Sequence, residues 1–110
     1  MSAQVKELTQ ANFDQAIGTG VTLVDFWAPW CGPCRMQLPV LESVATAVGE
    51  SAVIAKVNVD ENPQLAERFG VRSIPTLILF QDGKAVRQFV GVQQAHTLRA
   101  AVEAYAGAVK

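Results

Sequence analysis

The chain has 110 residues, of which 50% are hydrophobic, and a formal net charge of −1 at pH 7. This length and apolar content suit one folded domain over residues 1–110 and exclude wholesale disorder. A charge near zero, without a basic cluster, offers no electrostatic support for a nucleic-acid or anionic-membrane partner. No apolar stretch approaches the roughly 20 residues of a membrane span.

The segment 1–7 lacks the charged-then-apolar layout of a signal peptide. We therefore expect a cytoplasmic protein, and we expect it to be a monomer. In a reducing compartment a close pair of cysteines is more often catalytic or metal-binding than structural.

The first half of the chain alternates strands and helices. A short strand at 5–8 and a short helix around 13–17 precede the apolar run 21–28, which only Asp25 interrupts. A run that is apolar on both faces is typical of a parallel sheet covered on both sides. A helix should follow over 32–48, and its inward-facing apolar set should be Met36, Leu38, Val40, Leu41, Val44, Ala45 and Val48.

The second half predicts a strand at 52–59 and a short helix that starts at Asn62-Pro63. Strands at 76–80 and 85–90 flank Asp82-Gly83, which is a hairpin signal, and a last helix should run over 94–106. Alternation followed by a hairpin implies an α/β fold, with a mixed central sheet of about five strands and helices on both faces.

Both cysteines, Cys31 and Cys34, lie two residues apart between the strand 21–28 and the following helix. Free N–H groups and the helix dipole at a helix start favour the thiolate of Cys31, and the thiolate attacks disulfides. Cys34, one turn further in, should be more buried. Cys31 would then attack a partner's disulfide and Cys34 would resolve the mixed disulfide. Gly32 allows close backbone approach, and Pro33 restricts the loop.

Two other interpretations of the cysteines remain open at this stage. A structural zinc site usually needs four protein ligands, and His96 is the only histidine, so carboxylates would have to complete it. Two inert core thiols would leave the neighbouring Trp30 and Pro33 unexplained.

A charged residue inside an apolar strand is the second candidate for chemistry. Burial would raise the pKa of Asp25, and Lys56 in the strand 52–59 would partly compensate its charge if the two strands are neighbours. Asp25 would then accept the proton of Cys34, directly or through water. The alternative is a carboxylate at a strand end that reaches solvent.

Residues 25–36 closely resemble the active-site segment of the thioredoxin family, and the match continues through Pro39, residues 56–60, residues 74–76 and Gly91. The resemblance implies the thioredoxin fold and an enzyme that reduces protein disulfides through its own Cys31–Cys34 pair, without another cofactor or a metal. It implies a flavin-containing thioredoxin reductase as electron source and disulfide-containing proteins as substrates.

The resemblance also implies a substrate surface. Pro75 would be cis and face the cysteines, and the backbone of Ile74 would pair with an extended substrate segment. Trp30, Ile74, Pro75 and Gly91 would contribute apolar contacts. The chain departs from the family pattern at Ser73, where glycine is common and which would be strained at a positive φ, and at Gln37-Leu38.

Two further functions remain open on the same fold. One is a disulfide oxidant or isomerase, although the oxidising members of the family usually carry histidine where Pro33 stands. The other is a non-enzymatic subunit that docks a partner regardless of redox state.

Overall fold

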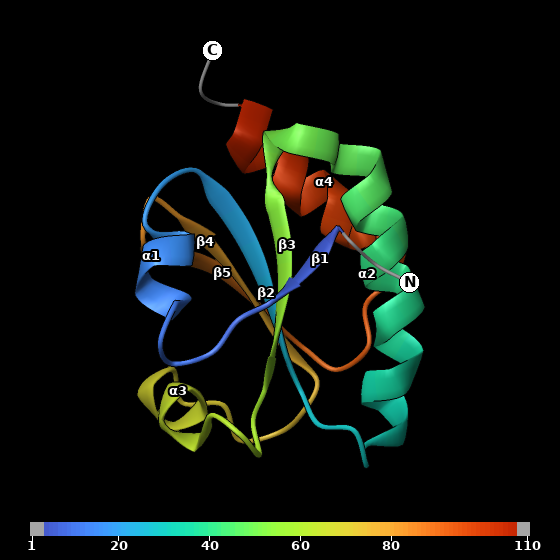
Figure 1. The fold of residues 1–110 in the computed structure, drawn as a ribbon. Helices are drawn as coiled ribbons and strands as arrows, with labels where there is room; N and C mark the ends of the chain where they lie inside the picture. The colour runs from blue at the N-terminus through green and yellow to red at the C-terminus, as the bar shows by residue number, and fades with distance from the viewer. Residues whose placement is uncertain (1–3, 108–110) are drawn as a thin grey trace.

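A mixed sheet with strand order β1-β3-β2-β4-β5 forms the centre of the computed structural model, which describes residues 4–107 (Figure 1). β2 (Val21–Trp27) is the middle strand, parallel to β3 (Val53–Asn58) and antiparallel to β4 (Thr76–Gln81). β1 (Val5–Glu7) and β5 (Lys84–Val90) form the edges. The predicted mixed sheet is confirmed. The ends of the expected domain, 1–3 and 108–110, lie outside the described residues.

Helices cover both faces of this sheet (Figure 1). α1 (Phe13–Ile17) and α3 (Pro63–Arg68) lie on one face, and α2 (Gly32–Val48) and α4 (Ala95–Ala106) lie on the other. A short 3-10 turn, Gly49–Ser51, follows α2. Across residues 4–107 no helix has the length and apolar character needed to cross a membrane.

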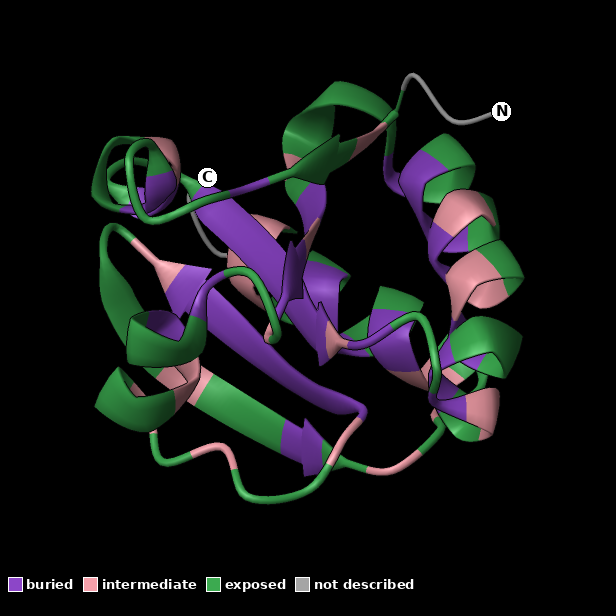
Figure 2. Ribbon diagram, turned by 60° about the horizontal axis from the view of Figure 1, so that its bottom comes forward, coloured by how far each residue is buried: buried purple, intermediate pink, exposed green. Residues whose placement is uncertain are grey.

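β2 is buried on both sides, as its apolar sequence predicts (Figure 2). Val21 and Leu23 belong to the core beneath α2 and α4, whereas Val24 and Phe26 belong to the core beneath α1 and α3. Side chains alternate between the faces of a strand. Asp25 therefore points to the face that α2 covers.

The β4–β5 hairpin turns at the predicted position. Asp82 and Gly83 both have positive φ, 51° and 87°, as a type I′ turn requires. Asp82 also ties the turn to the start of β2, since its carboxylate accepts a hydrogen bond of 2.8 Å from the Gly20 N–H.

The buried face of α2 differs from the predicted one. Met36 is 67% exposed, and Leu38 and Val40 are only half-buried, whereas Gln37 is fully buried. The buried positions recur every three or four residues, as helix geometry dictates: Cys34, Gln37, Leu41, Val44, Ala45 and Val48. The prediction for Met36 was wrong because it followed residue type rather than this spacing.

Candidate functional site

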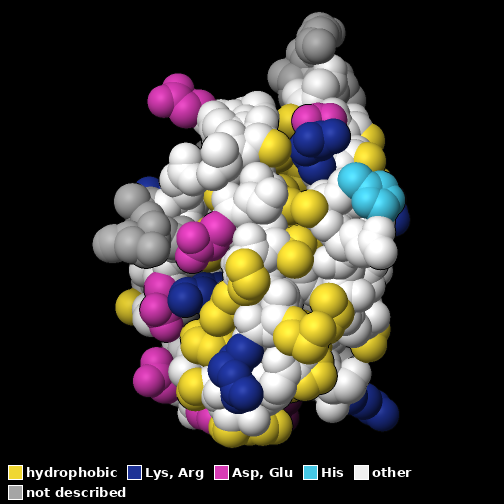
Figure 3. Space-filling view, turned by 90° about the vertical axis from the view of Figure 1, so that its right-hand side faces the viewer, with side chains coloured by type: hydrophobic (Ala, Val, Ile, Leu, Met, Phe, Trp, Pro, Cys, Tyr) yellow, Lys and Arg dark blue, Asp and Glu magenta, His cyan; other side chains and the backbone are white. Residues whose placement is uncertain are grey.

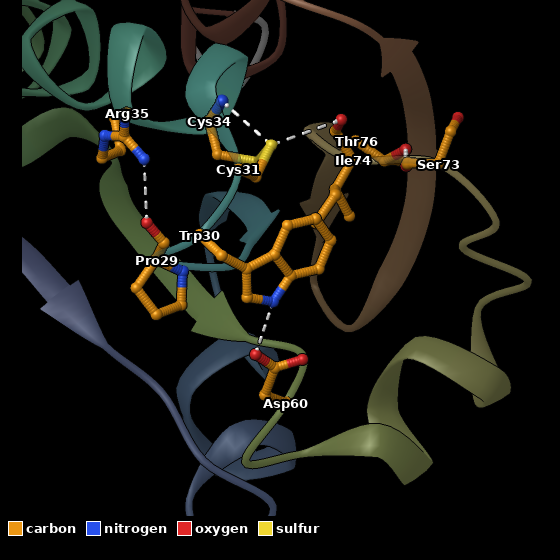
Figure 4. Close-up of a disulfide and its surroundings, with 9 residues drawn as sticks. All are labelled: Pro29, Trp30, Cys31, Cys34, Arg35, Asp60, Ser73, Ile74 and Thr76. Carbon is orange, nitrogen blue, oxygen red and sulfur yellow. Dashed lines mark hydrogen bonds between the residues drawn. A yellow bond between two sulfur atoms is a disulfide. The ribbon is translucent and has the colours of Figure 1, made fainter.

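The cysteine pair sits where β2 gives way to α2. Cys31 is the N-cap of α2, and Pro33 lies in its first turn. Cys31 and Cys34 form a disulfide, with Cα atoms 5.2 Å apart, and the Cys34 N–H donates a 3.2 Å hydrogen bond to the Cys31 sulfur (Figure 4). The unpaired N–H groups of a helix start favour negative charge nearby. The site is therefore suited to hold a thiolate at Cys31 after reduction.

The two sulfurs differ in access. Cys31 is 6% exposed, whereas Cys34 is fully buried against Ala28 and its neighbours. The expectation that Cys34 is the more buried thiol is confirmed. A bulky partner can approach only Cys31.

The loop before β4 faces the cysteines. The Ile74–Pro75 peptide is cis, as the resemblance implied, and the Ile74 carbonyl oxygen lies 3.8 Å from the Cys31 sulfur. Pro75 itself is buried, whereas Ile74 is half-buried and supplies the accessible part of this pair. Ser73 is not strained: among residues 4–107, Asp82 is the only non-glycine residue with a positive φ.

Gly91 joins this loop from the other side. Its φ of 88° lies in the region that favours glycine, and its N–H donates a 2.8 Å hydrogen bond to the Pro75 carbonyl. Gly91 thus lies beside the cis-proline loop, where the resemblance places a substrate-binding residue.

Trp30 projects from the site with 67% of its surface exposed. Its indole N–H donates a 2.8 Å hydrogen bond to a carboxylate oxygen of Asp60, which fixes the ring beside Ile74 (Figure 4). The sequence analysis did not single out Asp60. The available signal was its position just after β3, since parallel strands end at the same sheet edge and β3 lies beside β2.

A hollow of about 380 Å³ lies next to the Trp30 ring. Its lining combines apolar side chains with one cation: Trp30, Val59, Ala66, Val71, Arg72, Ser73 and Ile74. Figure 3 looks onto the side formed by α2 and shows hydrophobic side chains gathered toward the end where that helix begins. The exposed large hydrophobic residues of this region are Trp30, Met36, Val90 and Val92.

Asp25 lies on the face of β2 that α2 covers and has no solvent exposure, and among residues 4–107 neither of its carboxylate oxygens has a hydrogen-bond partner. Burial raises the pKa of Asp25 from 3.8 to about 7, and the positive charge of Lys56 opposes that rise. Lys56 is the Cα partner of Asp25 across the β2–β3 pair, and its ammonium lies 4.9 Å from the centre of the Trp27 ring. Within residues 4–107, no N–O contact of 4.0 Å or less joins Lys56 to Asp25.

Two other polar side chains, Arg35 and His96, differ in their distance from the cysteines along the fold. Arg35 is exposed and donates a 3.1 Å hydrogen bond to the Pro29 carbonyl, so it braces the loop before Cys31 (Figure 4). His96 is exposed on α4 and lines a separate hollow with Ser43 and Arg99. The described part of the chain contains no cluster of three or more side chains suited to a metal ion.

Comparisons with known proteins decide the family. The sequence profile of the Thioredoxin family matches residues 4–104. The chain belongs to the thioredoxin family. A thioredoxin from Alicyclobacillus acidocaldarius is 56% identical over 94 residues, covering 84% of this chain and 90% of its own. One from Staphylococcus saprophyticus is 50% identical over 99 residues, covering 90% and 95%.

A solved structure supports the same assignment. A mutant thioredoxin from Halobacterium salinarum superimposes with a TM-score of 0.86 at 40% identity, covering 96% of this chain and 95% of its own. The thioredoxin fold is therefore confirmed. Family membership and the Cys31–Cys34 disulfide together make the protein a thiol–disulfide oxidoreductase that reduces protein disulfides.

The raised pKa of Asp25 predicts a pH-dependent effect of the substitution Asp25→Asn. As pH rises from the unfolded pKa of about 3.9 to the folded value of about 7, the unfolded state loses its proton first, so the wild type loses stability. Asp25→Asn has no ionisable group at this position, so its unfolding free energy does not fall for this reason. The difference in unfolding free energy between variant and wild type should therefore grow by about 4 kcal/mol between about pH 4 and pH 8.

Urea unfolding of the oxidised proteins at several pH values measures this difference. Glu50→Gln, at an exposed carboxylate after α2, is the control and should follow the wild-type profile. A difference for Asp25→Asn that stays constant with pH would contradict the raised pKa.

Proposed function

We propose that Cys31 is the nucleophile of this reductase and Cys34 its resolving thiol. The observation that carries the proposal is the difference in access between two sulfurs at one helix start. The Cys31 thiolate attacks one sulfur of the substrate disulfide, and the other leaves as a thiolate that takes a proton from solvent. Cys34 then attacks the Cys31 sulfur and releases the second substrate thiolate. The substrate gains two electrons, and the Cys31–Cys34 disulfide forms.

Asp25 is the proton acceptor for Cys34 in the second step, directly or through one water molecule. Its side chain faces α2, which carries Cys34, and a pKa of about 7 allows it to exchange protons near neutral pH. Lys56 assists by keeping part of the Asp25 population ionised despite burial.

Substrates bind as extended segments along Ile74. Within residues 4–107, the Ile74 N–H donates to no acceptor, so it remains available to a substrate strand. Trp30 provides an apolar contact on one side, and Pro75 and Gly91 form the floor on the other. The exposed Pro33 and the half-buried Gly32 leave space beside Cys31 for the substrate backbone.

The partners that this chemistry needs are disulfide-containing proteins and a reductase that restores the dithiol. A thioredoxin reductase fits the second role, since family members usually take electrons from one. The disulfide itself is the redox group, so no added cofactor or metal enters the cycle.

The chain acts as a one-domain monomer over 1–110 in the cytoplasm, without a nucleic-acid or membrane partner. Its net charge of −1 gives no electrostatic support for a nucleic-acid or anionic-membrane partner.

Substituting each cysteine separately tests the assigned roles. Cys34→Ser should accumulate a stable mixed disulfide with a protein substrate because the resolving thiol is missing. Cys31→Ser should form no such adduct, since its remaining thiol is fully buried. Non-reducing electrophoresis with mass spectrometry identifies the linked cysteine. An adduct through Cys34 in the second variant would reverse the assignment.

The role of Asp25 is tested by the rate of mixed-disulfide release. Asp25→Ala should slow release by roughly 10- to 100-fold near pH 7, because Cys34 then loses its proton acceptor. Rapid mixing of the reduced protein with a disulfide substrate separates release from the initial attack, whose rate should change little. If release is as fast as in the wild type across the pH range, Asp25 is not the acceptor.

A further inference from the structure

α2 carries a fully buried amide, Gln37, on the same face as Cys34. It lies one turn after Cys34 and one turn before Leu41, in a stripe that is otherwise apolar. A buried amide is tolerated only when its polar atoms have partners. The partners of Gln37 therefore show what this position does.

Both polar groups of Gln37 bind the backbone of one residue, Gln93. The Gln37 side-chain N–H donates to the Gln93 carbonyl at 3.0 Å, and the Gln93 N–H donates to the Gln37 side-chain oxygen at 2.7 Å. Gln93 lies in the loop 91–94 between β5 and α4. The paired bonds fix this loop against the helix that carries the cysteines.

The same loop is tied to the substrate surface. The Gln93 side chain donates to the carbonyls of Val90 and Gly91, at 3.3 and 3.2 Å. The Gly91 N–H in turn donates to Pro75 at 2.8 Å. A continuous set of hydrogen bonds thus runs from α2 through the loop to the cis-proline segment, with Val90 and Val92 exposed along it.

We propose that Gln37 is a positioning residue that holds the loop 91–94 in place for protein substrates. Without its amide, the N–H and carbonyl of Gln93 lose their partners, and substrate binding must order the loop. The side-chain hydrogen bonds of Gln37 go to Gln93 and not to either sulfur, so Gln37 governs affinity for protein disulfides rather than cysteine reactivity. The inference rests on the proposed substrate binding along Ile74 and Gly91.

Gln37→Met tests this role, because methionine has a similar volume and cannot make either hydrogen bond. With a reductase supplying electrons, KM for a protein disulfide such as insulin should rise about fivefold, while kcat stays within about twofold. The second-order rate with a small aromatic disulfide, which does not reach the loop, should be unchanged. Hydrogen exchange at the Gly91 and Gln93 amides should accelerate at least about tenfold.

Gln88→Met, an exposed position on β5, is the matched control and should leave KM and exchange unchanged. Gln93→Ala is the second variant, since its partly exposed side chain can be removed without disturbing the core. It removes the bonds to Val90 and Gly91 and should raise KM in the same direction. Gln93→Ala leaves both bonds between Gln37 and the Gln93 backbone in place, so it tests the link from the loop to Gly91. If Gln37→Met does not fold, Gln37→Leu, a second apolar replacement that removes both Gln37 bonds, takes its place with the same expected rise in KM.

An unchanged KM in folded Gln37→Met, with only a lower melting temperature, would overturn the proposal. Equal slowing with protein and small disulfides would also overturn it, because Gln37 would then act on the cysteines. Failure of the wild type to reduce insulin would instead count against the proposed substrate binding, so the two failures are distinguishable.

Discussion

The site depends on the end of β2, where the central strand stops and α2 begins. Because β3 and β4 pair with β2 on its two sides, the strand cannot shift without breaking two ladders. Its end therefore places Cys31 at the N-cap of α2 with little freedom. The same strand fixes Asp25 on the face that α2 covers. One element thus positions both Cys31 and the buried carboxylate of Asp25.

This arrangement retains an unfavourable feature at the centre of the protein. Asp25 is fully buried without a hydrogen bond to any residue in the described range 4–107, and the charge of Lys56 compensates its ionised form only in part. A stable fold alone gives no reason to keep such a group, because an apolar residue would serve the core better. Strongly perturbed acids cluster at functional sites, and this one lies on the sheet face covered by α2, the helix that carries Cys34.

Features of the fold that depend on local sequence pattern could be predicted from the sequence alone. Apolar runs located the strands, the Asp82-Gly83 pair located the hairpin, and a charge inside an apolar run singled out Asp25. The cis Ile74–Pro75 bond followed only from family resemblance, since X–Pro bonds are mostly trans.

Contacts between distant residues could not be predicted in the same way. The hydrogen bonds Trp30–Asp60 and Gln37–Gln93 join residues 30 and 56 positions apart, and only the folded chain brings them together. Gln37 nevertheless had a usable signal: it falls on the buried stripe at helical spacing. Following residue type placed Met36 there instead.

The proposed proton transfer depends on a buried carboxylate, Asp25, whose pKa is near neutrality and which lies on the sheet face that α2 covers. Carbon-13 NMR of the Asp25 side-chain carboxyl, followed through a pH titration of the oxidised protein, measures that pKa directly. We expect a midpoint at about 7. A midpoint close to the ordinary value of 3.8 would contradict it, because Asp25 would then be too weak a base to accept the proton of Cys34.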